Sequence, residues 1–139
     1  MSNYGIVELS NRPGSFRARV PMLKKGTYTS KDFSNEKYLH PMTSAQAWRD
    51  ELGKSTWGEE IWMYIKKTKS VRCLWGKKGG VSVCHKTIEG EGEIWIVMWR
   101  EKGKPKIMPF LLKDDIEAKK NAEEYAKKKK VELSFLNRI

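Results

Sequence analysis

Two arginines alternate with apolar residues in the segment 16–20, and their side chains could read bases in a nucleic acid. Phe16, Ala18 and Val20 occupy every second position, a pattern that predicts a half-buried β-strand. Arg17 and Arg19 would then lie on its outer face, one strand repeat apart. A guanidinium can donate two parallel hydrogen bonds to O6 and N7 of guanine, so this strand suits the major groove of DNA. The alternative is that both arginines only solvate an exposed face.

Further cations surround this strand in predicted turns: Arg12, Lys24, Lys25 and Lys31. Such side chains could bind phosphates and so fix the register of the protein on DNA. In a later predicted hairpin, Lys102 and Lys104 could also reach phosphate. The lysine run 127–130 is better explained as a solvated helix end, where cations complement the helix dipole.

The overall charge of the chain agrees with a polyanionic partner. The 139 residues carry a net charge of +11, which favours nucleic acid first and an acidic membrane surface second. A hydrophobic content of 39% is enough for a packed core and argues against disorder. No apolar stretch is long enough to span a bilayer, and the N-terminus lacks a signal-peptide core. We therefore expect a soluble protein of the cytoplasm.

Catalytic and metal-binding patterns are weak in this sequence. Cys73 and Cys84 lack CxxC spacing, and two histidines are too few for a paired-histidine nuclease site. The carboxylates of Asp114 and Asp115 are better explained by a helix cap, and those of segment 89–93 by a glycine-rich turn. We expect no enzymatic activity, no metal and no cofactor.

The first 53 residues predict three strands followed by a helix. Weak alternation over 5–10 ends at a dense turn signal, strand 16–20 follows, and a third strand ends near Phe33. Thr43 and Gln46 would form a capping box at the start of a helix, and Gly53 would stop it. Residues 1–53 are thus predicted to form one sheet-plus-helix unit.

The same order is predicted again over residues 80–139. Several pairs of similar residues are offset by 77 positions: Gly26 and Gly103, Phe33 and Phe110, Ala45 and Ala122, Trp48 and Tyr125. Strands are predicted at 81–84, 94–99 and 106–112, and a helix to about Lys130, with Ile116 among its inward residues and Asp114 and Glu117 as its capping box. The predicted fold is α+β: two three-stranded antiparallel sheets, each backed by a C-terminal helix, as a tandem repeat.

The basic, aromatic segment 54–79 is predicted to connect the two units. Trp57, Ile61, Tyr64 and Ile65 favour an amphipathic helix, although the run 61–65 would serve equally well as a buried strand. Residues 71–75 predict a strand that leads into the second unit.

The residues of the first unit also resemble a known family. The segments 5–7, 16–20, 25–26 and 45–52, together with Phe33, are similar to the Apetala-two/ethylene-response-factor domain in the versions found in bacteriophage and mobile-element proteins. The resemblance implies a three-stranded sheet in the major groove with a helix across its back. It adds Thr27 and Thr29 to the expected DNA contacts, which are then Arg12, Arg17, Arg19, Lys24, Lys25, Thr27, Thr29, Lys31, Lys102 and Lys104.

The second unit departs from that family. Ile96 and Met98 stand where the first unit has Arg17 and Arg19, and Ile94 is apolar too. A strand with two apolar faces is usually covered on both sides, so the connecting segment, a protein partner or a second copy should cover this one.

Together these features predict a non-enzymatic, double-stranded DNA-binding protein, a phage-type regulator or accessory factor that acts in the host cytoplasm. The alternative is a phage-type inhibitor that binds a host protein through Ile94, Ile96 and Met98. A third possibility is single-stranded nucleic acid stacked on Trp57, Trp62 or Trp75.

Overall fold

The computed structural model describes residues 3–75 and 80–136, and it divides the chain into unit 1 (Met1–Lys69) and unit 2 (Ser70–Ile139). Residues 76–79 of the predicted connecting segment and the last three residues of the chain lie outside the described part. Each unit contains one three-stranded antiparallel sheet, so the α+β class is confirmed.

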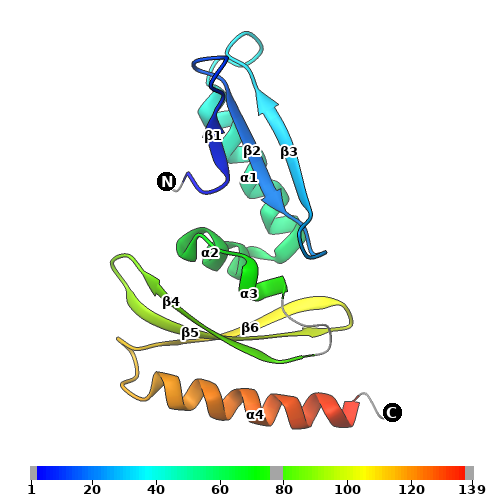
Figure 1. Cartoon of the computed structure of the whole chain (residues 1–139), viewed down its shortest axis with the longest axis vertical. Helices are drawn as coiled ribbons and strands as arrows, with labels where there is room; N and C mark the ends of the chain where they lie inside the picture. Colours follow the sequence, from blue (N-terminus) through cyan, green and yellow to red (C-terminus); the bar gives the residue numbers. More distant parts are fainter. Residues whose placement is uncertain (1–2, 76–79, 137–139) are drawn as a thin grey trace. The chain divides into compact units, whose positions relative to one another are not determined.

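The sheet of unit 1 has the order β1 (Ile6–Glu8), β2 (Phe16–Pro21) and β3 (Tyr28–Phe33) (Figure 1). All three strands agree with the alternation read from the sequence. In the register of the sheet, Ala18 of β2 lies opposite Ile6 on one side and Lys31 on the other. Since directly opposed residues of antiparallel strands share a face, this register decides which side chains stand together.

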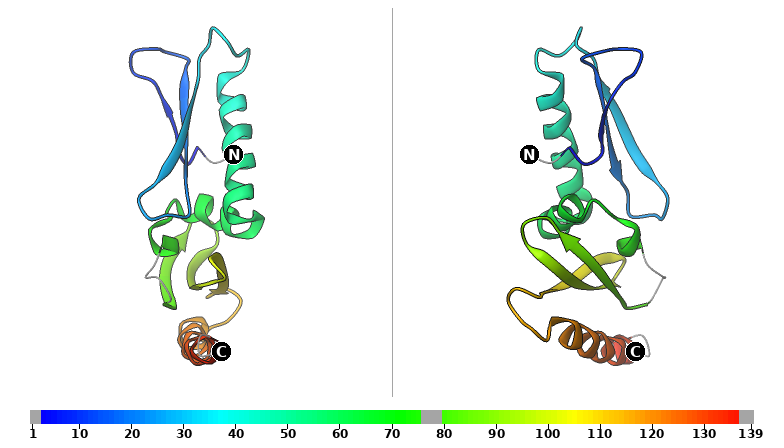
Figure 2. Two further views of the ribbon diagram at one scale, coloured as in Figure 1. Left: turned by 90° about the vertical axis from the view of Figure 1, so that its right-hand side faces the viewer. Right: turned by 60° about the vertical axis from the view of Figure 1, so that its left-hand side comes forward.

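Helix α1 (Pro41–Trp57) packs against β2 and β3 along one face of this sheet, as Figure 2 shows. The core between them contains Ile6, Ala18, Phe33 and Ala45, all buried. The predicted capping box is wrong: His40 occupies the N-cap position and no side chain caps this end. Pro41 begins the helix because its fixed φ suits the first turn, which leaves Thr43 already inside the helix.

Gly53 does not end α1, contrary to the sequence prediction. The helix continues to Trp57 and ends at Gly58, whose φ of 89° is costly for other residues. A Cβ at Gly53 would lie 2.1–2.6 Å from the ring of Trp62, which belongs to α2 (Glu59–Thr68). The glycine is therefore needed for close packing of α1 and α2. The preference for a helix over a buried strand at residues 61–65 is confirmed, but this helix begins at Glu59, and Trp57 belongs to α1.

A charged network also joins α1 and α2. The Oδ1 atom of Asp50 accepts hydrogen bonds from Arg49 Nε, Trp62 Nε1 and Lys66 Nζ, each at 3.1 Å. Arg49 is only 1% exposed, and its Nη1 also donates to the carbonyl of Tyr4 at 3.0 Å. Burial alone would raise the pKa of Asp50, but the hydrogen bonds from Arg49, Trp62 and Lys66 outweigh it and lower that pKa.

The sheet of unit 2 has the order β4 (Ser82–Ile88), β5 (Gly92–Glu101) and β6 (Lys104–Leu111). Its strands are longer than the predicted ones. Lys102 and Gly103 connect β5 to β6 with φ angles of 52° and 79°. Positive φ at both central residues fits the tight hairpin turn expected at this position.

Two helices lie on opposite faces of this second sheet, α3 (Arg72–Trp75) and α4 (Ala118–Leu136) (Figure 1). The prediction of a strand over 71–75 is wrong, since the N–H groups of Leu74 and Trp75 donate to the carbonyl of Val71 and close a helical turn. The prediction for α4 is wrong at its start. Ile116 is 90% exposed, and it is Asp115 that accepts a hydrogen bond from the N–H of Glu117.

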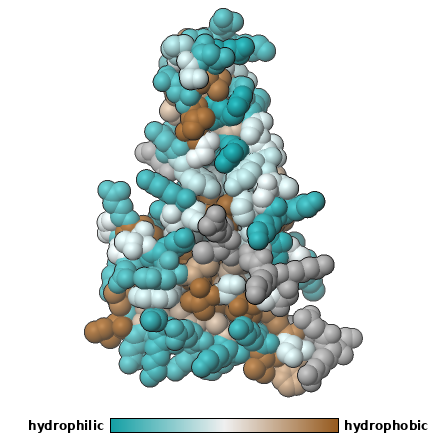
Figure 3. Space-filling model, in the orientation of Figure 1, coloured by the Kyte–Doolittle hydropathy of each residue, from teal (hydrophilic) through white to brown (hydrophobic). Residues whose placement is uncertain are grey.

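Strand β5 is buried on both faces, as its sequence predicts. Trp95, Val97 and Trp99 pack against the buried alanines of α4, while the exposed side of the first half of α4 is mostly hydrophilic (Figure 3). The other face carries Ile94, Ile96 and Met98, which are 0%, 6% and 3% exposed. Helix α3 contacts β5, so part of the predicted connecting segment belongs to the packing of unit 2.

Candidate nucleic-acid interface

The side of the β1–β2–β3 sheet that faces away from α1 forms one exposed surface, here called the open sheet face. Its residues are Val7, Arg17, Arg19, Tyr28, Ser30 and Asp32. The register explains this grouping: Arg17 lies opposite Val7 and Asp32, and Arg19 lies opposite Ser30. Because Ala18 and Val20 bury their side chains towards α1, both arginines of β2 must point outward.

Arg17 is held by a two-point ion pair across the sheet. Its Nε lies 2.7 Å from Oδ1 of Asp32, and its Nη2 lies 3.2 Å from Oδ2. The hydrogen bonds from Arg17 lower the pKa of Asp32 and raise the pKa of Arg17. Both groups are therefore charged at neutral pH. The carboxylate of Asp32 beside Arg17 follows from the register between β2 and β3, which the sequence analysis did not predict.

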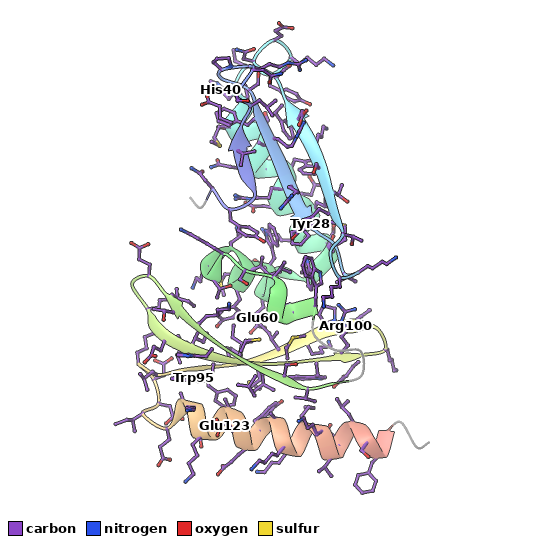
Figure 4. The ribbon with its side chains drawn as sticks, in the orientation of Figure 1. Tyr28, His40, Glu60, Trp95, Arg100 and Glu123 are labelled. Atoms are coloured by element: carbon purple, nitrogen blue, oxygen red, sulfur yellow. The ribbon has the colours of Figure 1, made fainter. Side chains whose placement is uncertain are left out.

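Arg19 is held in a different way, by an aromatic ring. Its guanidinium carbon lies 4.0 Å from the ring centroid of Tyr28, a cation–π contact. Tyr28 begins β3, beside the β2–β3 turn (Figure 4). A guanidinium stacked through its flat face keeps its N–H groups at the edge, where they remain free to donate in the plane of the group.

Cations stand beyond both ends of β2. Arg12 lies in the β1–β2 turn, and Lys24 and Lys25 lie in the β2–β3 turn, all three exposed. Thr27, also an expected contact, donates its hydroxyl to the carbonyl of Lys24 at 2.6 Å and so stabilises that turn. The structure thus brings Arg12, Lys24 and Lys25 to the edges of the open sheet face.

Thr29 and Lys31 are exposed but lie on the opposite face of β3 from Asp32 and Ser30. Lys31 is part of the strand, not of a turn as predicted, and its Nζ lies 5.4 Å from the ring centroid of Phe33. The structure does not bring these two side chains together with Arg17 and Arg19. Successive residues of a strand point to alternate faces, so the pairing of β3 with β2 determines which residues of β3 share a face with Arg17 and Arg19.

The remaining expected contacts belong to unit 2. Lys102 and Lys104 are exposed at the β5–β6 turn. Of the three aromatic rings proposed for base stacking, Trp57 and Trp62 are buried and Trp75 is half-buried. Trp57 also donates its indole N–H to the carbonyl of Pro21, so it belongs to the core of unit 1.

A polar depression of about 440 Å³ adjoins the Asp32 end of the open sheet face. It is lined by Arg12, Pro13, Ser15, Asp32, Ser34, Asn35, Glu36 and Lys37. Its lining carries cations and anions together, which suits a solvated edge beside a larger contact surface.

Other kinds of site have little support in the described part of the chain. Among the side chains that the structure describes within residues 3–75 and 80–136, no three from His, Cys, Asp or Glu gather as metal ligands would. Cys84 is buried. Nor does any helix within these ranges have the length and apolar character needed to cross a bilayer.

Comparison with protein-family models, with curated proteins and with solved structures finds no match to this chain. The case for a function therefore depends on the open sheet face and its surroundings.

Proposed function

We propose that this protein binds double-stranded DNA without enzymatic activity, by docking the open sheet face of unit 1 in the major groove. The observation that carries the proposal is the placement of Arg17 and Arg19 on the central strand of an exposed antiparallel face, with cations beyond both ends. The resemblance to the Apetala-two/ethylene-response-factor domain suggests the same docking. A phage-type regulator or accessory factor in a host cytoplasm fits such a protein.

The dimensions of the sheet suit the groove. Three strands spaced by about 4.8 Å place the outer two about 10 Å apart, close to the major-groove width of about 12 Å. Strand β2 spans about 17 Å over its six residues, so Arg12 at one end and Lys24 and Lys25 at the other could meet the phosphates that border the groove. Arg17 and Arg19 would then face the base edges.

We further infer that unit 2 is a divergent duplicate of unit 1. Both units follow the order of three strands and a later helix, and Ala45 and Ala122 are each fully buried at equivalent offsets. Unit 2 would have kept the fold but lost direct base contacts when Ile96 and Met98 replaced arginine. Its share in binding would be phosphate contacts from Lys102 and Lys104.

The rival function, capture of a host protein through Ile94, Ile96 and Met98, has less support. These side chains are core residues in this structure, and docking through them would require them to be uncovered first. The exposed charges of the open sheet face need no such change to reach a partner.

The test is the affinity for random duplex DNA across a salt series, for the native protein and an Arg17→Ala/Arg19→Ala variant. A Lys119→Ala/Lys120→Ala variant is the matched control, because it removes two exposed charges from α4. We expect a steep fall of affinity with salt and a larger loss in the arginine variant than in the control. Equal losses in the two variants, or no binding at low salt, would contradict the proposal.

A further inference from the structure

Each arginine of the open sheet face is restrained on one side and available on the other. Asp32 occupies the Nε–H of Arg17 and one N–H of its Nη2. A guanidinium has five N–H groups, so three remain on Arg17, two on Nη1 and one on Nη2. Two of these three, one from each Nη atom, point in parallel at the end of the side chain, and this is a fork that matches O6 and N7 of guanine.

Arg19 is restrained by an aromatic ring, whereas Arg17 is restrained by a carboxylate. The guanidinium carbon of Arg19 lies 4.0 Å from the ring centroid of Tyr28, and this cation–π contact limits rotation of the side chain. The Cα atoms of Arg17 and Arg19 are about 7 Å apart, the length of one strand repeat. Two forks on one face at this spacing are suited to two guanines a few base pairs apart at most.

We propose that Asp32 and Tyr28 are positioning residues that set the specificity of this interface for closely spaced guanines. The inference rests on the proposed DNA-binding function. An arginine that is already oriented loses less side-chain freedom when it meets a base, so a correct base is favoured over a wrong one. Asp32 also repels phosphate, so it weakens attachment to the DNA backbone and further separates specific from non-specific binding.

Asp32 thus acts on affinity in two opposite directions: it strengthens binding to guanine sites by orienting Arg17, and it weakens binding to any DNA by repelling phosphate. These opposite effects allow the proposal to be tested. Removing the carboxylate should lower the preference for guanine sites while leaving affinity for random DNA unchanged or tighter. A simple ion pair that competes with DNA would instead give tighter binding to every duplex when Asp32 is removed, with the preference preserved.

The experiment begins with selection of duplexes from a random library by the full-length native protein. Dissociation constants are then measured for the selected duplex, for random duplex and for the selected duplex with 7-deazaguanine, which lacks the N7 acceptor. The variants are Asp32→Ala, Tyr28→Ala and Tyr28→Phe. Glu36→Ala is the matched control, because Glu36 is an exposed carboxylate in the same polar depression, and its loss changes the charge equally.

We expect the native protein to select duplexes that contain guanine. The specificity ratio is the dissociation constant for random duplex divided by that for the selected duplex. Asp32→Ala should lower this ratio about tenfold, roughly the value of one oriented arginine–guanine contact. The loss of affinity caused by 7-deazaguanine in the selected duplex should also be smaller for Asp32→Ala than for the native protein. Tyr28→Ala should lower the ratio as well, whereas Tyr28→Phe and Glu36→Ala should preserve it. Thermal unfolding of each variant checks that the sheet persists, which is expected because Asp32 and Tyr28 are exposed.

The outcomes separate the two proposals. If Arg17→Ala/Arg19→Ala weakens binding but Asp32→Ala keeps the full ratio, the positioning role is wrong and DNA binding by the open sheet face stands. Selected sites without guanine would also overturn the positioning role. If the native protein binds no duplex, both proposals fail together.

Discussion

Asp50 of α1 is bonded to two residues of α2, Trp62 and Lys66. Its carboxylate accepts hydrogen bonds from three groups, among them the buried Arg49, which would lose this charged hydrogen bond without it. Replacing Asp50 by Asn should therefore lower the free energy of unfolding by about 2–3 kcal/mol at neutral pH. Urea unfolding measures the loss, and Glu51→Gln, an exposed neighbour on α1, is the control.

The contribution of Asp50 should depend on pH in a defined direction. Its pKa is lower in the folded than in the unfolded protein, so its stabilising effect is full above the unfolded pKa and is lost as the pH falls through the folded one. The stability difference between native protein and Asp50→Asn should shrink as the pH falls from about 5 to below the ordinary aspartate pKa of about 3.9. A difference that stays constant across this range would show that the carboxylate is not held in its charged form.

Gly53 offers a prediction in which two effects oppose each other. Within a helix, alanine is favoured over glycine by about 1 kcal/mol, so Gly53→Ala should stabilise α1 taken alone. The added Cβ would overlap the Trp62 ring, however, and such overpacking costs about 1–3 kcal/mol or more. We expect net destabilisation in thermal unfolding; a higher melting temperature would mean that α1 and α2 do not pack as described.

At the scale of single residues, the sequence predicts outward and inward positions well but not partners. Alternation alone placed Arg17 and Arg19 outside and Ala18 and Val20 inside. Asp32 and Tyr28 could not be found in this way, because their roles depend on the register between β2 and β3. The prediction that Gly53 ends α1 is wrong for a similar reason. A glycine after a helical pattern is a typical stop signal, but this glycine packs against Trp62, nine residues later in the chain.

At the scale of elements, α4 is joined to its sheet through a stripe of small residues. Ala118, Ala122 and Ala126 recur every four residues and pack against Trp95, Val97 and Trp99. Ala122→Leu should therefore lower the stability of unit 2 by about 1–3 kcal/mol, because the buried stripe leaves no space for the larger side chain. Lys120→Leu, on the exposed side of α4, is the control, and comparable losses in the two variants would contradict this packing.

The elements of unit 1 follow from local patterns, and the errors occur where local patterns are ambiguous. All three strands and the presence of α1 and α2 were predicted. The segment 71–75, apolar except for Arg72, suits a strand or a helical turn equally well by periodicity, and it forms a turn that contacts β5. The start of α4 shifted because adjacent Asp114 and Asp115 are equally suitable caps by type.

At the scale of the whole molecule, the positive charge is shared by the two units. Unit 1 has 12 basic and 7 acidic residues, a net +5, and unit 2 has 16 and 10, a net +6. If the open sheet face carries specificity, a fragment of residues 1–69 should fold and keep the preference for selected sites. It should lose affinity for random DNA and show a shallower salt dependence, because about half of the net charge is gone.

Circular dichroism and the same binding assays test the fragment. Loss of site preference in a folded fragment would show that unit 2 takes part in base recognition. An unfolded fragment would show that unit 1 needs the rest of the chain for stability.

The most direct measurement of the central claim is a nuclear magnetic resonance titration of the full-length, isotope-labelled protein with duplex DNA. The largest shifts should fall on the open sheet face, on the backbone amides of Val7, Arg17, Arg19, Tyr28, Ser30 and Asp32, and on the side-chain Nε–H groups of Arg17 and Arg19. Shifts confined to α4 or to the β5–β6 turn, with the open sheet face unchanged, would contradict the proposed interface.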